Sequence, residues 1–130
     1  MHSLLLPITQ ANRVLIHYCD GGSFSGDRTE PLTDASTGNQ IFVRGKRILE
    51  AVFEDLLVSQ GMDAATDVLL TGTSAGGLAT FLHADHVQEL LPSSVKRYGT
   101  MPISGFFLDH VDINGSSTYG DELRYVFDCE

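Results

Sequence analysis

The sequence predicts an α/β fold with a mostly parallel sheet. Residues 13–18 and 67–71 are short apolar runs without clean alternation of polar and apolar positions, as in strands that are buried on both faces. Apolar residues recur at helical spacing between these runs, and a second helical pattern follows Ser74. A strand, a helix and another strand in this order are typical of a parallel βαβ unit with a right-handed connection.

The sequence predicts two helices. Residues 41–60 carry apolar side chains at i, i+3, i+4, i+7 and i+8, and Gly61 ends the pattern. The second helix is expected to begin at Ala75 and to end before Pro92, whose ring cannot continue a helix. A weaker third strand is expected near Val95, and residues 106–108 suit a short strand or the start of a helix. The apolar positions of the two helical patterns are Leu49, Val52, Phe53, Leu56 and Leu57, then Leu78, Phe81, Leu82, Val87, Leu90 and Leu91.

Composition and charge narrow the class of protein. A length of 130 residues, of which 42% are apolar, suits one globular domain or a piece of one. The formal net charge of −9 repels phosphate backbones and argues against nucleic-acid binding. No apolar run approaches the ~20 residues that cross a bilayer. The N-terminus lacks the basic residues and the long apolar stretch of a signal peptide.

The two cysteines, Cys19 and Cys129, form no recognisable disulfide framework. A bridge would require their Cα atoms to lie within about 4.4–6.8 Å of each other. The sequence leaves both a bridge and two free thiols open, and we favour free thiols.

The segment from Gly72 to Gly76 fits the pattern G-x-S-x-G between a predicted strand and a predicted helix. This is the setting of a nucleophile elbow, in which the serine lies on a sharp turn at the carboxyl end of a strand. Gly72 and Gly76 are expected to let the adjacent elements pack closely. We therefore assign Ser74 as a candidate nucleophile and the backbone N–H of Ala75 as a candidate oxyanion-hole donor. The alternative is a turn whose serine only caps the helix.

A serine nucleophile needs a histidine base and an acid. His110, next to Asp109, is a candidate base, although neighbours on an extended segment point to opposite faces. His83 and His86 lie on the helix that leads away from Ser74, so neither is expected to reach it. They are spaced to share a metal ion with Asp85, but a solvated helix face is the favoured interpretation.

Four sequence blocks in register resemble the pectin acetylesterase and Notum family of serine carboxylester hydrolases. The resemblance extends over about residues 12–112, with Ser74 at the position of the family's nucleophile and Ala75 at that of an oxyanion donor. Three positions depart from the family's cysteine pattern, namely Thr73, Ala84 and Arg97. The blocks are residues 12–27, Arg44 with Gly45, residues 70–79, and residues 91–109 with gaps.

The resemblance implies a partial α/β-hydrolase-like three-layer sandwich, with residues 1–130 forming a single partial domain. It implies a secreted or cell-wall enzyme that hydrolyses acyl esters without a metal or organic cofactor. The expected substrate is an acylated polysaccharide, pectin first, with a Notum-like lipid ester as the alternative. The family's other oxyanion loop would precede Met1, and its triad Asp and His would follow Glu130. A non-catalytic fragment or an inactive homologue is therefore the competing hypothesis.

A glycine-rich loop follows the first predicted strand and is expected to lie beside the elbow, at the carboxyl end of the sheet. Its three glycines and short polar side chains favour turns. Asp20, Gly21 and Ser23 are the candidate substrate-binding residues of this loop. The alternative is a turn without ligand contact.

Overall fold

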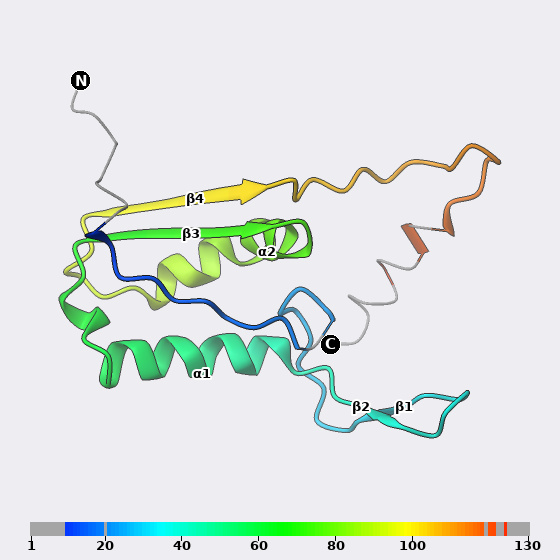
Figure 1. The fold of residues 1–130 in the computed structure, drawn as a ribbon, viewed down its shortest axis with the longest axis horizontal. Helices are drawn as coiled ribbons and strands as arrows, with labels where there is room; N and C mark the ends of the chain where they lie inside the picture. Colours follow the sequence, from blue (N-terminus) through cyan, green and yellow to red (C-terminus); the bar gives the residue numbers. More distant parts are fainter. Residues whose placement is uncertain (1–9, 20, 119, 122–123, 125–130) are drawn as a thin grey trace.

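The computed structural model describes residues 10–19, 21–118, 120, 121 and 124. This part of the chain is a mixed α/β structure (Figure 1). Its elements are the strands β1 (Leu32–Thr33), β2 (Gln40–Ile41), β3 (Asp67–Thr73) and β4 (Arg97–Ile103), the helices α1 (Gly45–Val58) and α2 (Ala75–Leu90), and the 3-10 turn η2 (Met62–Ala64).

A parallel βαβ unit forms the centre of the described structure. Strands β3 and β4 pair in parallel, from Asp67 opposite Arg97 to Thr73 opposite Ile103. Helix α2 connects them and packs against both strands (Figure 1). A parallel pair is therefore present, but it joins β3 to the weaker third predicted strand and not to residues 13–18, the partner in the predicted βαβ unit.

The predicted strand at residues 13–18 is wrong for the structure described. This segment is extended but belongs to no strand, and Val14 and Leu15 are 58% and 80% exposed. The apolar, β-branched residues indicated an extended chain, but a strand also needs a hydrogen-bonding neighbour, and the described chain pairs none with it. Ile16 packs against the hydrophobic core, and the ring of Tyr18 lies 5.8 Å from that of Phe24.

Helix α1 occupies most of the predicted range 41–60 but begins only at Gly45. The residues before it form the β1–β2 hairpin, which projects from the body of the structure (Figure 1). Leu49 and Phe53 are buried, as their spacing predicts. Ser59 caps the carboxyl end, and Gly61 turns the chain away with a φ of 78°.

Helix α2 has the predicted bounds but buries only part of the predicted face. Val87 is buried as its spacing predicts, whereas Phe81 and Leu82 are 53% and 43% exposed and Thr80 is buried instead. Near its start, α2 approaches the end of β4 closely at Gly77, because a residue without a Cβ leaves room for the backbone of Ile103. The apolar pattern therefore located the helix but not the contact face of its first turns.

The hydrophobic core lies on one side of the β3–β4 sheet, between the sheet and the helices. On the other side, Leu69, Met101 and Ile103 are between 43% and 47% exposed. The run at residues 106–108 forms neither a strand nor a helix. Within the described residues, no helix is both long and apolar enough to cross a membrane. The core residues are Phe24, Leu49, Phe53, Ala79 and Val87.

An ion pair between Asp67 and Arg97 joins the first residues of β3 and β4. The hydrogen bond from Arg97 lowers the pKa of Asp67, and the hydroxyl of Thr66 contributes to the shift. Because the folded pKa lies below the unfolded one, this contribution to stability is present above the ordinary carboxyl range and is lost as the pH falls through the folded value.

We expect Arg97→Ala to return the pKa of Asp67 toward its ordinary value, because the largest cause of the shift is removed. An NMR titration of the Asp67 carboxyl in the variant and the parent chain measures this change. Lys96→Ala is the matched control, since the Lys96 ammonium donates to the carbonyl of Ser93 instead. An unchanged Asp67 titration in Arg97→Ala would contradict the prediction.

Candidate active site

Ser74 occupies the sharp turn between β3 and α2. Its backbone has φ 57° and ψ −118°, a region that residues with a Cβ rarely adopt. The turn is fixed from both sides, because the Ser74 N–H donates to the carbonyl of Ile103 at 2.9 Å and the Ser74 carbonyl accepts from the N–H of Leu78 at 3.0 Å. The strain at Ser74 is therefore held in place by the end of β4 and by the first turn of α2.

The Ser74 side chain does not cap the helix. Ser74 is the N-cap residue of α2, yet its hydroxyl makes no capping hydrogen bond, and the residue is exposed. A serine that served only as a cap would direct its oxygen to an amide of the first turn. The geometry therefore favours the nucleophile interpretation over the capping alternative.

The close packing at the elbow depends on glycines. A Cβ on Gly72 would lie 2.2 Å from the carbonyl oxygen of Gly76, so no larger residue fits there without a backbone shift. Gly76 itself has open space where its Cβ would be. The prediction that both motif glycines are needed for close packing thus holds for Gly72 only.

A second close approach of two backbone segments was not predicted from the sequence. A Cβ on Gly77 would lie 2.6 Å from the carbonyl oxygen of Ile103, and one on Gly105 would lie 2.2 Å from the carbonyl carbon of Gly77. This contact holds the first turn of α2 against the chain that leaves β4. The Gly-Gly pair at positions 76 and 77 was its only sequence signal, and nothing there pointed to Gly105.

The first amides of α2 lie directly after Ser74. The Ala75 N–H is the first of them, and the first four N–H groups of a helix have no acceptor within the helix. With 16 residues, α2 also brings the positive end of its dipole to this point. The arrangement suits an oxyanion that forms on a group bound to Ser74.

The glycine-rich loop lies against the start of α2. The hydroxyl of Ser23 donates to the carbonyl of Ala75 at 3.3 Å, and Ser23 is only 5% exposed. Gly21 is exposed, with a φ of 70°. Asp20, the third candidate of this loop, lies outside the described residues. The predicted proximity of loop and elbow is therefore present, with Ser23 turned into the structure.

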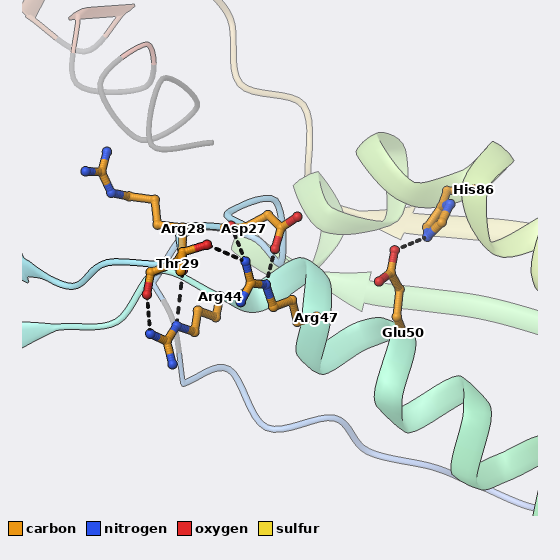
Figure 2. Close-up of polar contacts among 7 residues, drawn as sticks. All are labelled: Asp27, Arg28, Thr29, Arg44, Arg47, Glu50 and His86. Atoms are coloured by element: carbon orange, nitrogen blue, oxygen red, sulfur yellow. Dashed lines mark hydrogen bonds and ion pairs between the residues drawn. The ribbon is translucent and has the colours of Figure 1, made fainter.

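Two arginines at the start of α1 hold the chain that follows this loop (Figure 2). Arg44 donates to the carbonyls of Arg28 and Thr29, at 3.1 and 2.6 Å. Arg47 forms an ion pair with the carboxylate of Asp27 and donates to its carbonyl at 2.9 Å. These contacts therefore connect the start of α1 to residues 27–29.

The histidines of α2 do not lie on a solvated face, and that prediction is wrong. His83 is 9% exposed, and its Nε2 lies 2.9 Å from the carbonyl oxygen of Ser23. His86 is partly buried, and its Nε2 lies 3.4 Å from a carboxylate oxygen of Glu50 on α1 (Figure 2). Polar character suggested solvent, but His83 follows Thr80 by three residues and precedes Val87 by four, which places it in the buried stripe.

The remaining candidate groups lie at the surface. His110 is exposed and contacts the carbonyl of Val111. Cys19 is an exposed free thiol, and Cys129 lies outside the described residues. Across the described part of the chain, no three His, Cys, Asp or Glu side chains are grouped so as to hold a metal ion.

Comparison with known proteins gives one consistent family. The family model described as Pectinacetylesterase matches residues 7–129. Pectin acetylesterase 5 of Arabidopsis thaliana is 42% identical over 109 residues, which are 82% of this chain and 24% of that protein. Pectin acetylesterase 4 of the same organism is 40% identical over 117 residues, which are 88% of this chain and 27% of that protein.

A second group of relatives acts on a different ester. The palmitoleoyl-protein carboxylesterase NOTUM of Drosophila melanogaster is 38% identical over 103 residues, which are 76% of this chain and 15% of that protein. The chain thus spans about a quarter of the length of the pectin acetylesterases it matches, and less of NOTUM. No solved structure gives a significant match.

Proposed function

Because this chain belongs to the pectinacetylesterase family, we propose that it carries the nucleophile of a carboxylester hydrolase, and that Ser74 is that nucleophile. The observation that carries the proposal is the strained backbone of Ser74 together with a hydroxyl that is not used as a cap. Strain of this kind persists only where the surroundings hold it, and it is concentrated at functional sites.

The proposed reaction has two steps. The Ser74 hydroxyl oxygen bonds to the acyl carbon while a histidine base takes its proton, and the resulting oxyanion is stabilised by the N–H of Ala75. The carbon–oxygen bond to the alcohol then breaks, the histidine returns the proton to that alcohol, and water hydrolyses the acyl-enzyme. The base and the acid of this reaction are proposed from the family alone, and the chain spans about a quarter of the length of its relatives.

The proposed substrate is an acetylated polysaccharide of the pectin type. Pectin acetylesterase 5 of Arabidopsis thaliana is 42% identical to the chain, and NOTUM of Drosophila melanogaster is 38% identical. A lipid ester of the kind named for NOTUM is the second candidate. Gly21 is proposed to line the substrate site together with Asp20, while Ser23, being buried, would shape the loop from within.

We also propose that the β3–β4 sheet belongs to a larger three-layer α/β-hydrolase-like sandwich. Parallel sheets occur almost only with both faces covered, and one face of β3–β4 exposes Leu69, Met101 and Ile103. A secreted or cell-wall location is proposed from the relatives alone.

Labelling with a fluorophosphonate tests the nucleophile. We expect the folded chain to be labelled and Ser74→Ala to lose at least ~99% of the label, because removal of a nucleophile reduces the rate by several orders of magnitude. Ser93→Ala, a change at an exposed serine outside the elbow, is the matched control and should retain full labelling. A folded but unlabelled parent chain would overturn the assignment in favour of a non-catalytic fragment.

Release of acetate from acetylated pectin, measured beside release of palmitoleate from an acylated peptide, separates the two substrates.

A further inference from the structure

A buried histidine joins the glycine-rich loop to the helix that begins at the elbow. The Nε2 of His83 lies 2.9 Å from the carbonyl oxygen of Ser23, and the histidine is 9% exposed. A carbonyl oxygen can only accept a hydrogen bond, so Nε2 carries the proton.

The loop held by His83 has an unfavourable backbone. Ser23 and Phe24 have positive φ values of 53° and 59°, although neither is glycine. Conformations of this kind persist only where surrounding contacts determine them. Besides the bond to His83, the Ser23 N–H donates to the Tyr18 hydroxyl at 3.2 Å, and the Phe24 ring packs beside that of Tyr18.

A second hydrogen bond joins the same loop to the elbow. The Ser23 hydroxyl donates to the carbonyl of Ala75, at 3.3 Å, and Ala75 is the residue whose N–H we assign to the oxyanion hole. His83, Ser23 and Ala75 thus form a chain of contacts from the middle of α2 through the loop back to the start of α2. Ser23 thus contacts α2 at two residues, Ala75 and His83, that lie just over two helical turns apart.

We propose that His83 is a positioning residue of the active site. Its contact with the Ser23 carbonyl holds Ser23 and Phe24 in their strained conformation, which keeps the glycine-rich loop in place against the start of α2, next to Ser74. This role rests on the proposed function, because the position of the loop affects activity only if Ser74 reacts with a substrate. His83 itself touches the loop carbonyl and takes no part in the transfer of protons from Ser74.

Two conservative variants separate this role from simple packing. In His83→Gln the side-chain amide nitrogen can take the place of Nε2 and donate to the Ser23 carbonyl, whereas in His83→Asn the amide nitrogen lies closer to the helix and falls short. Glutamine and asparagine have the same chemical groups, so a difference between the two variants reports the reach to the Ser23 carbonyl. His86→Ala, three residues further along α2 and facing Glu50, is the control for loss of an imidazole.

The test measures hydrogen exchange of the peptide covering residues 18–27, together with the rate of fluorophosphonate labelling at Ser74, in the full chain. We expect His83→Ala and His83→Asn to exchange the loop amides at least ~10-fold faster and to label several-fold more slowly. His83→Gln and His86→Ala should match the parent. An NMR spectrum of the parent should show the His83 proton on Nε2.

Loop exchange that is unchanged in His83→Ala would overturn the proposal, and so would equal behaviour of His83→Gln and His83→Asn. If His83→Ala fails to fold, the glutamine and asparagine pair decides. The exchange measurement does not depend on activity. An unlabelled parent chain would therefore refute the proposed function, and the contact between His83 and the loop would then be judged by hydrogen exchange alone. A labelled parent chain in which His83 has no effect on the loop would refute only the positioning role.

Discussion

Gly72→Ala should lower the free energy of unfolding by about 1–3 kcal/mol, the usual cost of forcing an extra carbon into a packed site. The new Cβ would lie 2.2 Å from the Gly76 carbonyl oxygen, which belongs to the backbone and can move only with the first turn of α2. The turn that carries Ser74 would shift with it. We therefore also expect slower labelling of Ser74.

Gly76→Ala is the matched control, because it adds the same methyl group to the other glycine of the same motif. Its Cβ meets nothing within 4 Å, and alanine is favoured over glycine in a helix by about 1 kcal/mol. Chemical denaturation of both variants should give a loss for Gly72→Ala and no loss, or a gain, for Gly76→Ala. Equal destabilisation of the two would mean that the close approach at Gly72 does not determine the fold of the elbow.

Ser74→Gly should stabilise the chain while it abolishes labelling. The φ of 57° and ψ of −118° at Ser74 carry strain of about 1–3 kcal/mol, which glycine does not experience. The greater freedom of glycine in the unfolded chain offsets about 0.4–1 kcal/mol of this. A net gain of roughly 1 kcal/mol in the free energy of unfolding is therefore expected.

Ser74→Ala isolates the strain from the loss of the hydroxyl. Alanine keeps a Cβ and hence the strained backbone, so this variant should lose labelling without the gain in stability. Urea denaturation of the three chains under the same conditions measures the difference. A Ser74→Gly chain no more stable than Ser74→Ala would show that the elbow stores no strain, and it would remove the main physical support for Ser74 as a nucleophile.

The part of the site that was predictable from sequence is local. Ser74 and the bounds of α2 follow from a strand, a five-residue motif and a helix that are adjacent in the chain. Steric rules for glycine and proline act over the same short range. The approach of the glycine-rich loop to the elbow was also expected, and the contact between Ser23 and Ala75 agrees with it. The expectation assumed a strand before the loop, however, and residues 13–18 form none in the described chain.

The predictions that failed concern residues whose structure is decided by partners far along the chain. Residues 13–18 have the composition of a strand, but strand formation is decided by the neighbour that supplies hydrogen bonds. His83 has a polar side chain that suggests solvent, yet 60 residues separate it from the Ser23 carbonyl that it contacts. The contact of Gly77 with Gly105 likewise joins distant segments without any side chain to reveal it.

The uncovered side of β3 and β4 has a consequence for the colloidal behaviour of the chain. Within the described residues, exposed apolar side chains and strand edges that pair with no further strand form a surface through which copies can associate. The formal charge of −9 opposes such association at neutral pH, but this repulsion fades toward the isoelectric point near 4.8. Mild acid, which lowers the net charge, and high salt, which screens it, are therefore the conditions under which the chain is expected to precipitate.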